Sequence, residues 1–248
     1  MNHKAKQAGF TLIELMLAMA FIAMLLLAVA LMIIQVANIY NRGTLLRELN
    51  QTSRSIGKEL ESAMRSSSTF SLDPTAKRYV NNQWGGRLCL GQYTYVWNYG
   101  TALSAVNPNR NVYPTGAVVP NANIVKIGST NRYEISFVKV PDSGGSYCVA
   151  SGLGVYPNIS PTGAVEMMRS GDHTLVLHSF GIVSTPTATD SLSGQQLYKV
   201  TYTIGTNDLN ALNSTQTACK LPNVSGADPN YCSIQQFTIV LRVVNGVN

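Results

Sequence analysis

Charged residues are scarce in this 248-residue chain, at 12% of the sequence, about half the usual share. Lysine and arginine exceed aspartate and glutamate by six (18 minus 12), but nowhere do five like charges stand together. A mildly basic solvated surface explains this scattered excess without a nucleic-acid-binding function. Nucleic acid or a surface ligand stays open as a partner, although no pattern in the sequence supports either.

Cysteine pairs of the Cys-x-x-Cys type are also absent. The four cysteines are Cys89, Cys148, Cys219 and Cys232, and their wide spacing gives little support to a zinc or redox site. An even number of cysteines in an exported domain fits two disulfide bonds, with four free buried thiols as the alternative. We expect no metal and no cofactor.

Proline is missing from residues 10–65, and the only glycines there are Gly43 and Gly57. A stretch with so few helix breakers predicts one nearly continuous helix over residues 10–66, about 85 Å long. Residues 15–34 carry no charge, and about twenty apolar residues cross the roughly 30 Å hydrocarbon core of a membrane.

The second part of the predicted helix, residues 35–66, is amphipathic. Its apolar residues recur at spacings of three, four and seven with charged residues between them, which indicates a helix packed on one face. These residues are Val36, Ile39, Tyr40, Leu46, Leu49, Ile56, Leu60 and Met64.

Residues 67–248 differ in composition and are rich in Ser, Thr, Asn, Gln and Gly. Runs of strand-forming residues separated by turn residues predict strands at 88–99, 124–127, 133–140, 147–150, 174–183, 197–204 and 237–244. The last two alternate between apolar and polar residues, as in an antiparallel sheet with one face packed on a helix. The sequence therefore predicts an α+β fold, with the sheet against the apolar stripe of residues 46–64.

The N-terminus carries a motif. The chain begins with a short basic head, MNHKAKQAG, which ends in Gly9 and is followed by FTLIEL. Glycine therefore stands directly before the apolar Phe10, and Glu14 follows Gly9 by five residues, at the start of the apolar helix. Residues 6–15 resemble the leader and cleavage site of the type IV prepilin family. The resemblance is strong over about the first thirty residues, and the rest of the chain matches the family only in layout.

This resemblance implies a processing route. A prepilin peptidase would cut between Gly9 and Phe10 and methylate the new amine of Phe10. Glycine suits a peptidase groove because it has no Cβ to clash. A carboxylate at the edge of a transmembrane helix is expensive and usually functional. The resemblance implies that Glu14 pairs with the charged N-terminus of a neighbouring pilin subunit.

The implied organisation has four parts: a leader at 1–9, a transmembrane and assembly helix at 10–34, an amphipathic helix at 35–66, and a β-rich globular domain at 67–248. The protein is expected in the cytoplasmic membrane as a single-pass chain with a cytoplasmic N-terminus, and then in a cell-surface filament or pseudopilus. Its partners would be the peptidase, the membrane and the helices of other pilins.

Several alternatives remain. Many major pilins have a proline within the apolar helix and are shorter, so the chain is closer to a minor pilin or a type II secretion pseudopilin. A membrane-anchored adhesin or DNA-uptake protein that does not polymerise is a further alternative. An ordinary signal peptide cleaved after Ala20 or Ala30 is disfavoured, because the apolar run exceeds the usual length.

The resemblance also bears on the cysteines, because many pilins have a disulfide-bounded region near the C-terminus. Pro222, Gly226, Asp228 and Pro229 predict a loop between Cys219 and Cys232. We therefore predict a Cys219–Cys232 disulfide and a second one between Cys89 and Cys148. A Cys89–Cys219 pairing is the alternative left open.

Four other groups are better explained by structure than by chemistry, and we expect no enzyme. Asp142-Ser143-Gly144-Gly145 resembles a protease nucleophile loop but fits a β-turn better. Asp172, His173 and His178 do not have the spacing of a metal site on a regular strand. Asn207-Asp208 and Asp228-Pro229-Asn230 suit turns better than calcium. The aromatic run offers either a stacking platform or core packing, of which we expect packing: Tyr93, Tyr95, Trp97 and Tyr99.

Overall fold

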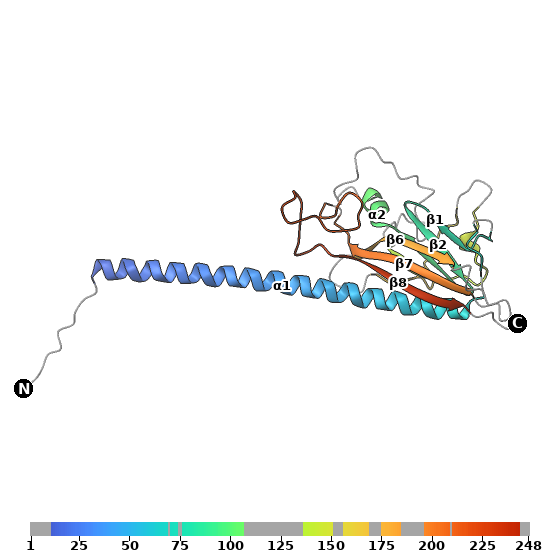
Figure 1. Cartoon of the computed structure of the whole chain (residues 1–248), viewed down its shortest axis with the longest axis horizontal. Coiled ribbons are helices and arrows are strands. Elements are labelled where there is room, and N and C mark those ends of the chain that lie inside the picture. Colours follow the sequence, from blue (N-terminus) through green and yellow to red (C-terminus); the bar gives the residue numbers. More distant parts are fainter. Residues whose placement is uncertain are drawn as a thin grey trace, which may run out of the picture. The chain divides into compact units, whose positions relative to one another are not determined.

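The computed structural model describes residues 11–68, 70–73, 76–106, 136–150, 156–168, 175–184, 196–208 and 210–243. It is an α+β protein, as predicted. The elements are α1 (Leu12–Ser66), β1 (Tyr79–Asn81), β2 (Gly85–Leu90), β3 (Tyr93–Asn98), α2 (Gly100–Val106), β4 (Phe137–Pro141), η3 (Ser146–Cys148), β5 (Val165–Glu166), β6 (Leu175–Ser184), β7 (Gln196–Thr206) and β8 (Ile234–Val243). Figure 1 shows these elements along the chain.

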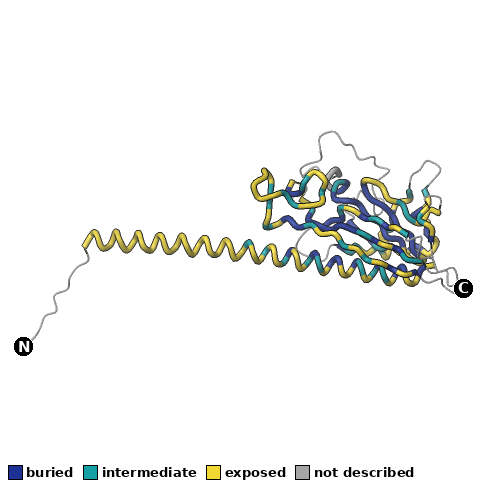
Figure 2. The backbone as a smooth tube through the Cα atoms, in the orientation of Figure 1, coloured by how far each residue is buried: buried dark blue, intermediate teal, exposed yellow. Residues whose placement is uncertain are grey.

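Helix α1 is one uninterrupted helix of 55 residues that includes both Gly43 and Gly57. The chain divides into two compact units, Met1–Thr44 and Leu45–Asn248, and the boundary falls inside this helix. Every residue from 11 to 37 is exposed, whereas buried residues begin at Leu45; Figure 2 shows this change in burial along the helix.

The second half of α1 buries one face, as the amphipathic pattern predicts. Leu49, Ile56, Leu60 and Met64 are fully buried. The prediction was wrong at Leu46, which is 39% exposed while its neighbour Leu45 is fully buried, and at three earlier positions that are also exposed: Val36, Ile39 and Tyr40. Leu45 and Leu49 lie one turn apart on the face that continues to Ile56, so the buried stripe begins one residue earlier than the sequence interpretation placed it.

The first sheet has five antiparallel strands in the order β1-β2-β3-β4-β5. The single strand predicted at 88–99 is instead the hairpin of β2 and β3, in which Leu90 pairs with Tyr93. The chain reverses at Gly91, whose φ of 58° is a left-handed conformation that glycine adopts without strain. The core-facing residues change from even positions (Leu88, Leu90) to odd positions (Tyr95, Trp97) across this turn, and the sequence interpretation overlooked this change of phase.

Two other strand predictions change in the first sheet. The strand predicted at 133–140 corresponds to β4, and its residues 133–135 lie outside the described part of the chain, as does the strand predicted at 124–127. The strand predicted at 147–150 is wrong, because this segment forms the short helix η3. The Asp142 carboxylate accepts hydrogen bonds from the N–H groups of Ser146 and Tyr147, each at 3.0 Å, and draws the chain into a turn.

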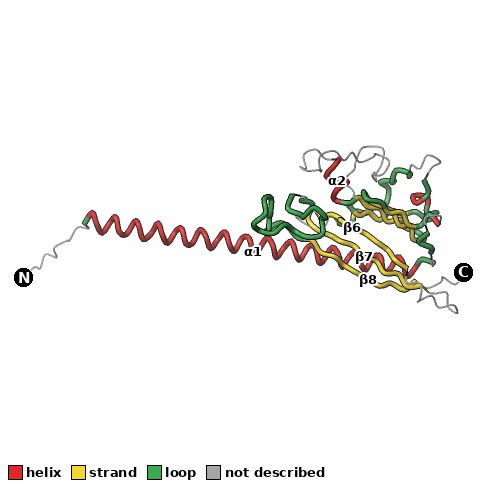
Figure 3. Tube along the Cα trace, turned by 45° about the horizontal axis from the view of Figure 1, so that its top comes forward, coloured by secondary structure: helices red, strands yellow, loops and turns green. Residues whose placement is uncertain are grey.

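The second sheet contains β6, β7 and β8 in that order, all antiparallel. It confirms the strands predicted at 174–183, 197–204 and 237–244, each within a few residues. In β7 the predicted residues Tyr198, Val200, Tyr202 and Ile204 are all buried, but every residue from Tyr202 to Thr206 is buried, so the alternation is confirmed only as far as Tyr202. Figure 3 shows β7 and β8 beside the second half of α1, and Tyr202 Oη donates a hydrogen bond of 2.9 Å to the Ser53 carbonyl of that helix.

Both sheets and the second half of α1 share one hydrophobic core. Its largest members are aromatic, and Trp97 lies between the two sheets. The Trp97 ring is 4.4 Å from Phe180 of β6 and 6.0 Å from Phe137 of β4, centroid to centroid. Such ring pairs add about 0.5–1.5 kcal/mol beyond the apolar area they bury.

Two disulfide bonds, Cys89–Cys148 and Cys219–Cys232, join the pairs that the sequence analysis proposed. The first ties β2 to η3. The second closes a segment of turns between Leu212 and β8, so the loop predicted between these cysteines is present.

A buried arginine holds the segment after η3 against the first sheet. Arg87 of β2 is 6% exposed and donates hydrogen bonds to the carbonyls of Tyr147 and Pro157 at 2.8 and 2.9 Å. Its guanidinium also lies 4.9 Å from the centre of the Tyr156 ring. Burial lowers the pKa of Arg87 to about 10.

Candidate functional site

The exposed half of α1 is the first candidate functional surface. Judged by length and composition, the helix could cross a membrane, and no residue of its most apolar stretch is buried. Leu17 and Phe21, for example, are 75% and 67% exposed. Burying one such side chain contributes about 1.5–3 kcal/mol, so water is a poor solvent for this surface and a lipid or protein covering is favoured.

The start of this helix is built around Glu14. The Thr11 N–H and the Thr11 hydroxyl each donate to Glu14 Oε2 at 2.9 Å, and the Glu14 N–H donates to Thr11 Oγ1 at 3.3 Å. This reciprocal arrangement is a capping box, in which the first and fourth residues of a helix start satisfy each other's free N–H groups. Glu14 therefore has a structural role within its own chain.

The capping box was missed in the sequence, although its signal is present. Thr11-Leu12-Ile13-Glu14 is a Thr-x-x-Glu sequence directly before an apolar run, which is the signature of a helix N-terminus. The box uses only Oε2 of the carboxylate, and no described residue bonds to Oε1. Among the described residues, the second oxygen therefore has no hydrogen-bond donor.

The predicted cleavage site, Gly9 and Phe10, lies outside the described residues, and so do Asp172 and His173. Cleavage and methylation therefore stay predictions. The described part of the chain supplies the segment immediately after that site, a capped helix start that continues into the apolar helix.

The turn at Asp142 does not have the arrangement of a catalytic site. Its carboxylate accepts from the Thr94 hydroxyl at 2.8 Å and the Ser146 hydroxyl at 2.9 Å, besides the two backbone N–H groups. Burial opposes ionisation, but these hydrogen bonds outweigh it and hold the pKa of Asp142 below its ordinary value. His178 contacts the Thr206 carbonyl at 3.2 Å. The acid thus serves the turn, as the sequence interpretation preferred.

The candidate metal and calcium ligands also serve local structure. Within the described ranges, no group of three or more His, Cys, Asp or Glu residues is placed to hold a metal ion. Asp208 accepts a hydrogen bond from the Asn210 N–H at 3.0 Å, and Asp228 accepts from Asn230 and Tyr231 at 3.2 and 3.1 Å. These are the local bonds that aspartate makes in turns.

The aromatic run on β3 is mostly core. Tyr95, Trp97 and Tyr99 are 0%, 0% and 6% exposed, which leaves no stacking platform and confirms the packing interpretation. Only Tyr93, at the start of the strand, is partly exposed, and its ring lies 3.9 Å from the Lys139 ammonium group.

Comparisons of the chain with protein-family models, with curated protein sequences and with solved structures found no match.

Proposed function

We propose that this chain is a structural subunit of a type IV pilus-like filament, cut between Gly9 and Phe10 and assembled through its N-terminal helix. One observation carries the proposal. A capped helix begins just after the predicted cleavage site, remains mostly apolar and exposed as far as residue 37, and then continues without a break into the core of the folded domain.

This arrangement suits a subunit whose apolar helix is surrounded first by lipid and later by the helices of other subunits. In the membrane, lipid covers the apolar residues of α1, and twenty uncharged residues match the thickness of a bilayer. In a filament, the same residues pack against like helices of other subunits. Cleavage at Gly9 leaves this helix attached to the domain, so the anchor also serves as the assembly element. The same features fit a secretion pseudopilin.

The carboxylate of Glu14 has two uses in this proposal. Oε2 caps the helix within the chain, and Oε1 accepts from the amine of Phe10 in a neighbouring subunit. The negative charge also lies in the first turn of α1, where the helix dipole stabilises it.

A second candidate is a membrane-anchored surface protein that does not polymerise, and the capping box is the observation that favours it. Because Thr11 already satisfies the Glu14 carboxylate, a glutamate at this position has a function even in a chain without neighbours.

The test is to express the full chain with a C-terminal tag in a host that has a prepilin peptidase and a pilus, then compare sheared filaments with membranes. A mature chain of 239 residues (248 minus 9) that is enriched in filaments supports the pilin proposal. The same cleavage with all protein left in the membrane favours the non-polymerising anchor. A chain beginning at Phe21 or Leu31 would overturn both, because it indicates removal of a signal peptide.

A further inference from the structure

A hollow on the folded domain lies where the end of α1, the β2–β3 hairpin and the turn after β4 meet. Its volume is ≈ 360 Å³, near the lower end of the range for small-molecule pockets. It is large enough for a single sugar-sized group. The hollow lies within the unit Leu45–Asn248 and is separate from the apolar half of α1.

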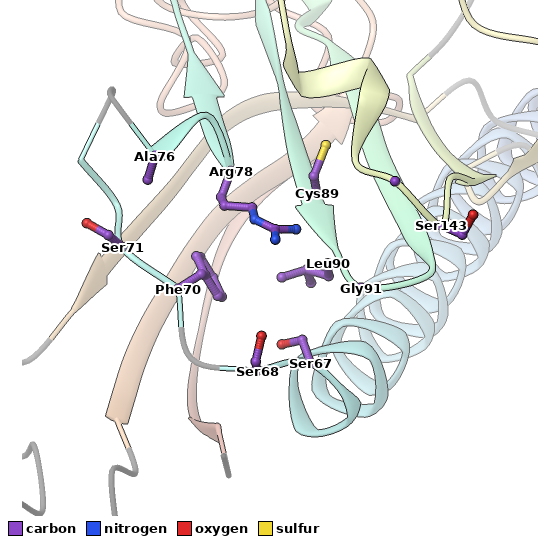
Figure 4. A pocket seen from close by; sticks show the side chains of 11 residues that line it. Ser67, Ser68, Phe70, Ser71, Ala76, Arg78, Cys89, Leu90, Gly91 and Ser143 are labelled. Atoms are coloured by element: carbon purple, nitrogen blue, oxygen red, sulfur yellow. The ribbon is translucent and has the colours of Figure 1, made fainter. Parts of the chain in front are cut away.

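Arg78 is the only charged residue among the described residues that line this hollow. Figure 4 shows its side chain reaching in toward Phe70 and Leu90, with the side chains of Ser67 and Ser68 on the facing wall, just after the end of α1. No hydrogen bond or ion pair links its guanidinium to any other described residue. Among the described lining residues, the hollow thus presents a positive fork of N–H donors with no acid beside it.

Capping of α1 does not account for Arg78. The last turn of the helix has free carbonyl groups, which an arginine often satisfies. Here the Ser66 and Ser67 hydroxyls donate to the carbonyls of Ala63 and Met64 at 3.0 and 2.9 Å. The guanidinium therefore remains available to a ligand.

The walls of the hollow are held in place by bonds of their own. On one side, Phe70 stacks on Tyr198 with ring centroids 4.6 Å apart, and the Phe70 N–H donates to Tyr198 Oη at 3.1 Å. On the other side, the hydrogen bonds to Asp142 fix the turn that carries Ser143 and Gly144. A preformed site loses little conformational freedom on binding, so even a small ligand gains affinity.

The lining combines three kinds of contact. Arginine pairs with a carboxylate through two parallel hydrogen bonds. Serine hydroxyls can donate to and accept from the hydroxyl groups of a sugar. Phe70 and Leu90, which are 8% and 3% exposed, supply an apolar floor for a ring. We propose that this hollow binds a carboxylate-bearing sugar residue of the uronic acid type, with its carboxylate on Arg78.

A neighbouring hollow offers space for a second sugar unit. It shares Ser143 and Gly144 with the first hollow, has a volume of ≈ 560 Å³, and is lined by Tyr93 and Tyr147. Tyrosine presents an apolar face and a polar tip, which suits a neutral sugar. Asp142 also lines this second hollow and Lys139 lies over the Tyr93 ring, so the second hollow provides space beside the first but does not define the length of the ligand.

The experiment titrates the full chain in detergent micelles with methyl glucuronide and with methyl glucoside, using ligand-observed NMR. The two compounds differ only at the carboxylate. We expect saturable binding of the glucuronide and at least about tenfold weaker binding of the glucoside, as for loss of a charge-assisted hydrogen bond. Arg78→Gln should weaken glucuronide binding by about tenfold or more for the same reason.

The matched control is Arg47→Gln, an exposed arginine on α1 outside this hollow, which should bind the glucuronide as the parent does. Near-UV circular dichroism of each variant checks that the domain is folded. Absence of saturable glucuronide binding, equal binding of the two sugars, or parent-like binding by Arg78→Gln would overturn the proposal. Displacement by an equal concentration of acetate would also overturn it, because it indicates a site for any anion. None of these results depends on filament assembly.

Discussion

Residues 12–37 and residues 45–66 belong to the same helix but have different surroundings. In the first segment every side chain is exposed and nearly every one is apolar, whereas in the second a single stripe is fully buried against two sheets. Helix propensity distinguishes them little, since both are composed mainly of good helix formers and only the second contains a glycine, Gly57. What differs is the distribution of apolar residues around the helix, which suits the first segment to a uniform apolar solvent and the second to a protein core.

Alkaline pH is expected to produce the largest difference in stability between the apolar helix and the folded domain. Burial, together with the neighbouring Tyr99, raises the pKa of Tyr79 from 10.0 to about 12. Burial also raises the pKa of four other core tyrosines: Tyr95, Tyr99, Tyr198 and Tyr202. A raised folded pKa contributes stability that is complete below the unfolded value of about 10 and is lost as pH rises toward 12.

We therefore expect the folded domain to lose its near-UV circular dichroism between about pH 10 and 12, while the apolar helix keeps its far-UV signal in micelles. Tyr79→Phe should make this loss less steep, because it removes one of the groups that titrate. A near-UV signal that persists through pH 12, or joint loss of both signals, would contradict the comparison.

Glu14→Gln separates the two uses of the carboxylate. Glutamine retains an oxygen for the Thr11 N–H and suits a capping box, but it has no charge for the amine of another subunit. Leaving that amine buried without a counter-charge costs about 3–5 kcal/mol, so we expect cleaved Glu14→Gln protein in membranes and little in filaments. Thr11→Ala is the converse control, since it weakens the cap by about 1 kcal/mol and keeps the charge. Equal incorporation of Glu14→Gln and the parent would remove Glu14 as an assembly contact.

Leu60→Ala and Leu26→Ala make the same deletion in the two segments. Leu60 is fully buried, and removing its side chain should lower the free energy of unfolding of the domain by about 2–5 kcal/mol. Leu26 is 61% exposed, so its replacement should leave that free energy unchanged. Urea unfolding in micelles, followed by tryptophan fluorescence, measures both. Similar losses for the two variants would mean that the exposed segment contributes to the core.

The smallest effect compares the two glycines. A Cβ on Gly43 meets nothing within 4 Å, so Gly43→Ala should stabilise the helix locally by up to about 1 kcal/mol. A Cβ on Gly57 lies 3.2 Å from Tyr202 Oη, and the helix gain there should be offset by crowding. Hydrogen exchange of the neighbouring amides measures each change. A larger gain at Gly57 than at Gly43 would show that Tyr202 moves aside at no cost.

The sequence was most informative where a periodic pattern ran uninterrupted. The long helix and strands β6, β7 and β8 follow directly from spacings of 3.6 and two residues. The hairpin at Gly91 was missed although the core-facing residues shift there from even to odd positions. The short helix η3 was missed because its cause is a side-chain contact from Asp142, four and five residues earlier. Periodicity reports which face a residue lies on, but it does not report turns that side chains create.

The candidate sites show the same limit. The Thr11–Glu14 cap could be predicted from four consecutive residues, since Thr-x-x-Glu before an apolar run is the signature of a helix start. The hollow at Arg78 could not be predicted from the sequence. It is lined by residues from distant segments, including Ser67, Arg78 and Ser143, which only the packed structure brings together.

The way the folded domain holds α1 has a mechanical consequence. The helix enters the domain at Leu45 and remains in contact with the core as far as Met64, along its own axis. A pull on the N-terminal end therefore loads these contacts in shear, and Leu45, Leu49, Ile56, Leu60 and Met64 resist together rather than one after another. Within the helix, the backbone hydrogen bonds of successive turns lie in series along the pull. Tension should accordingly extend the segment before Leu45 while the helix from Leu45 to Met64 remains packed in the domain.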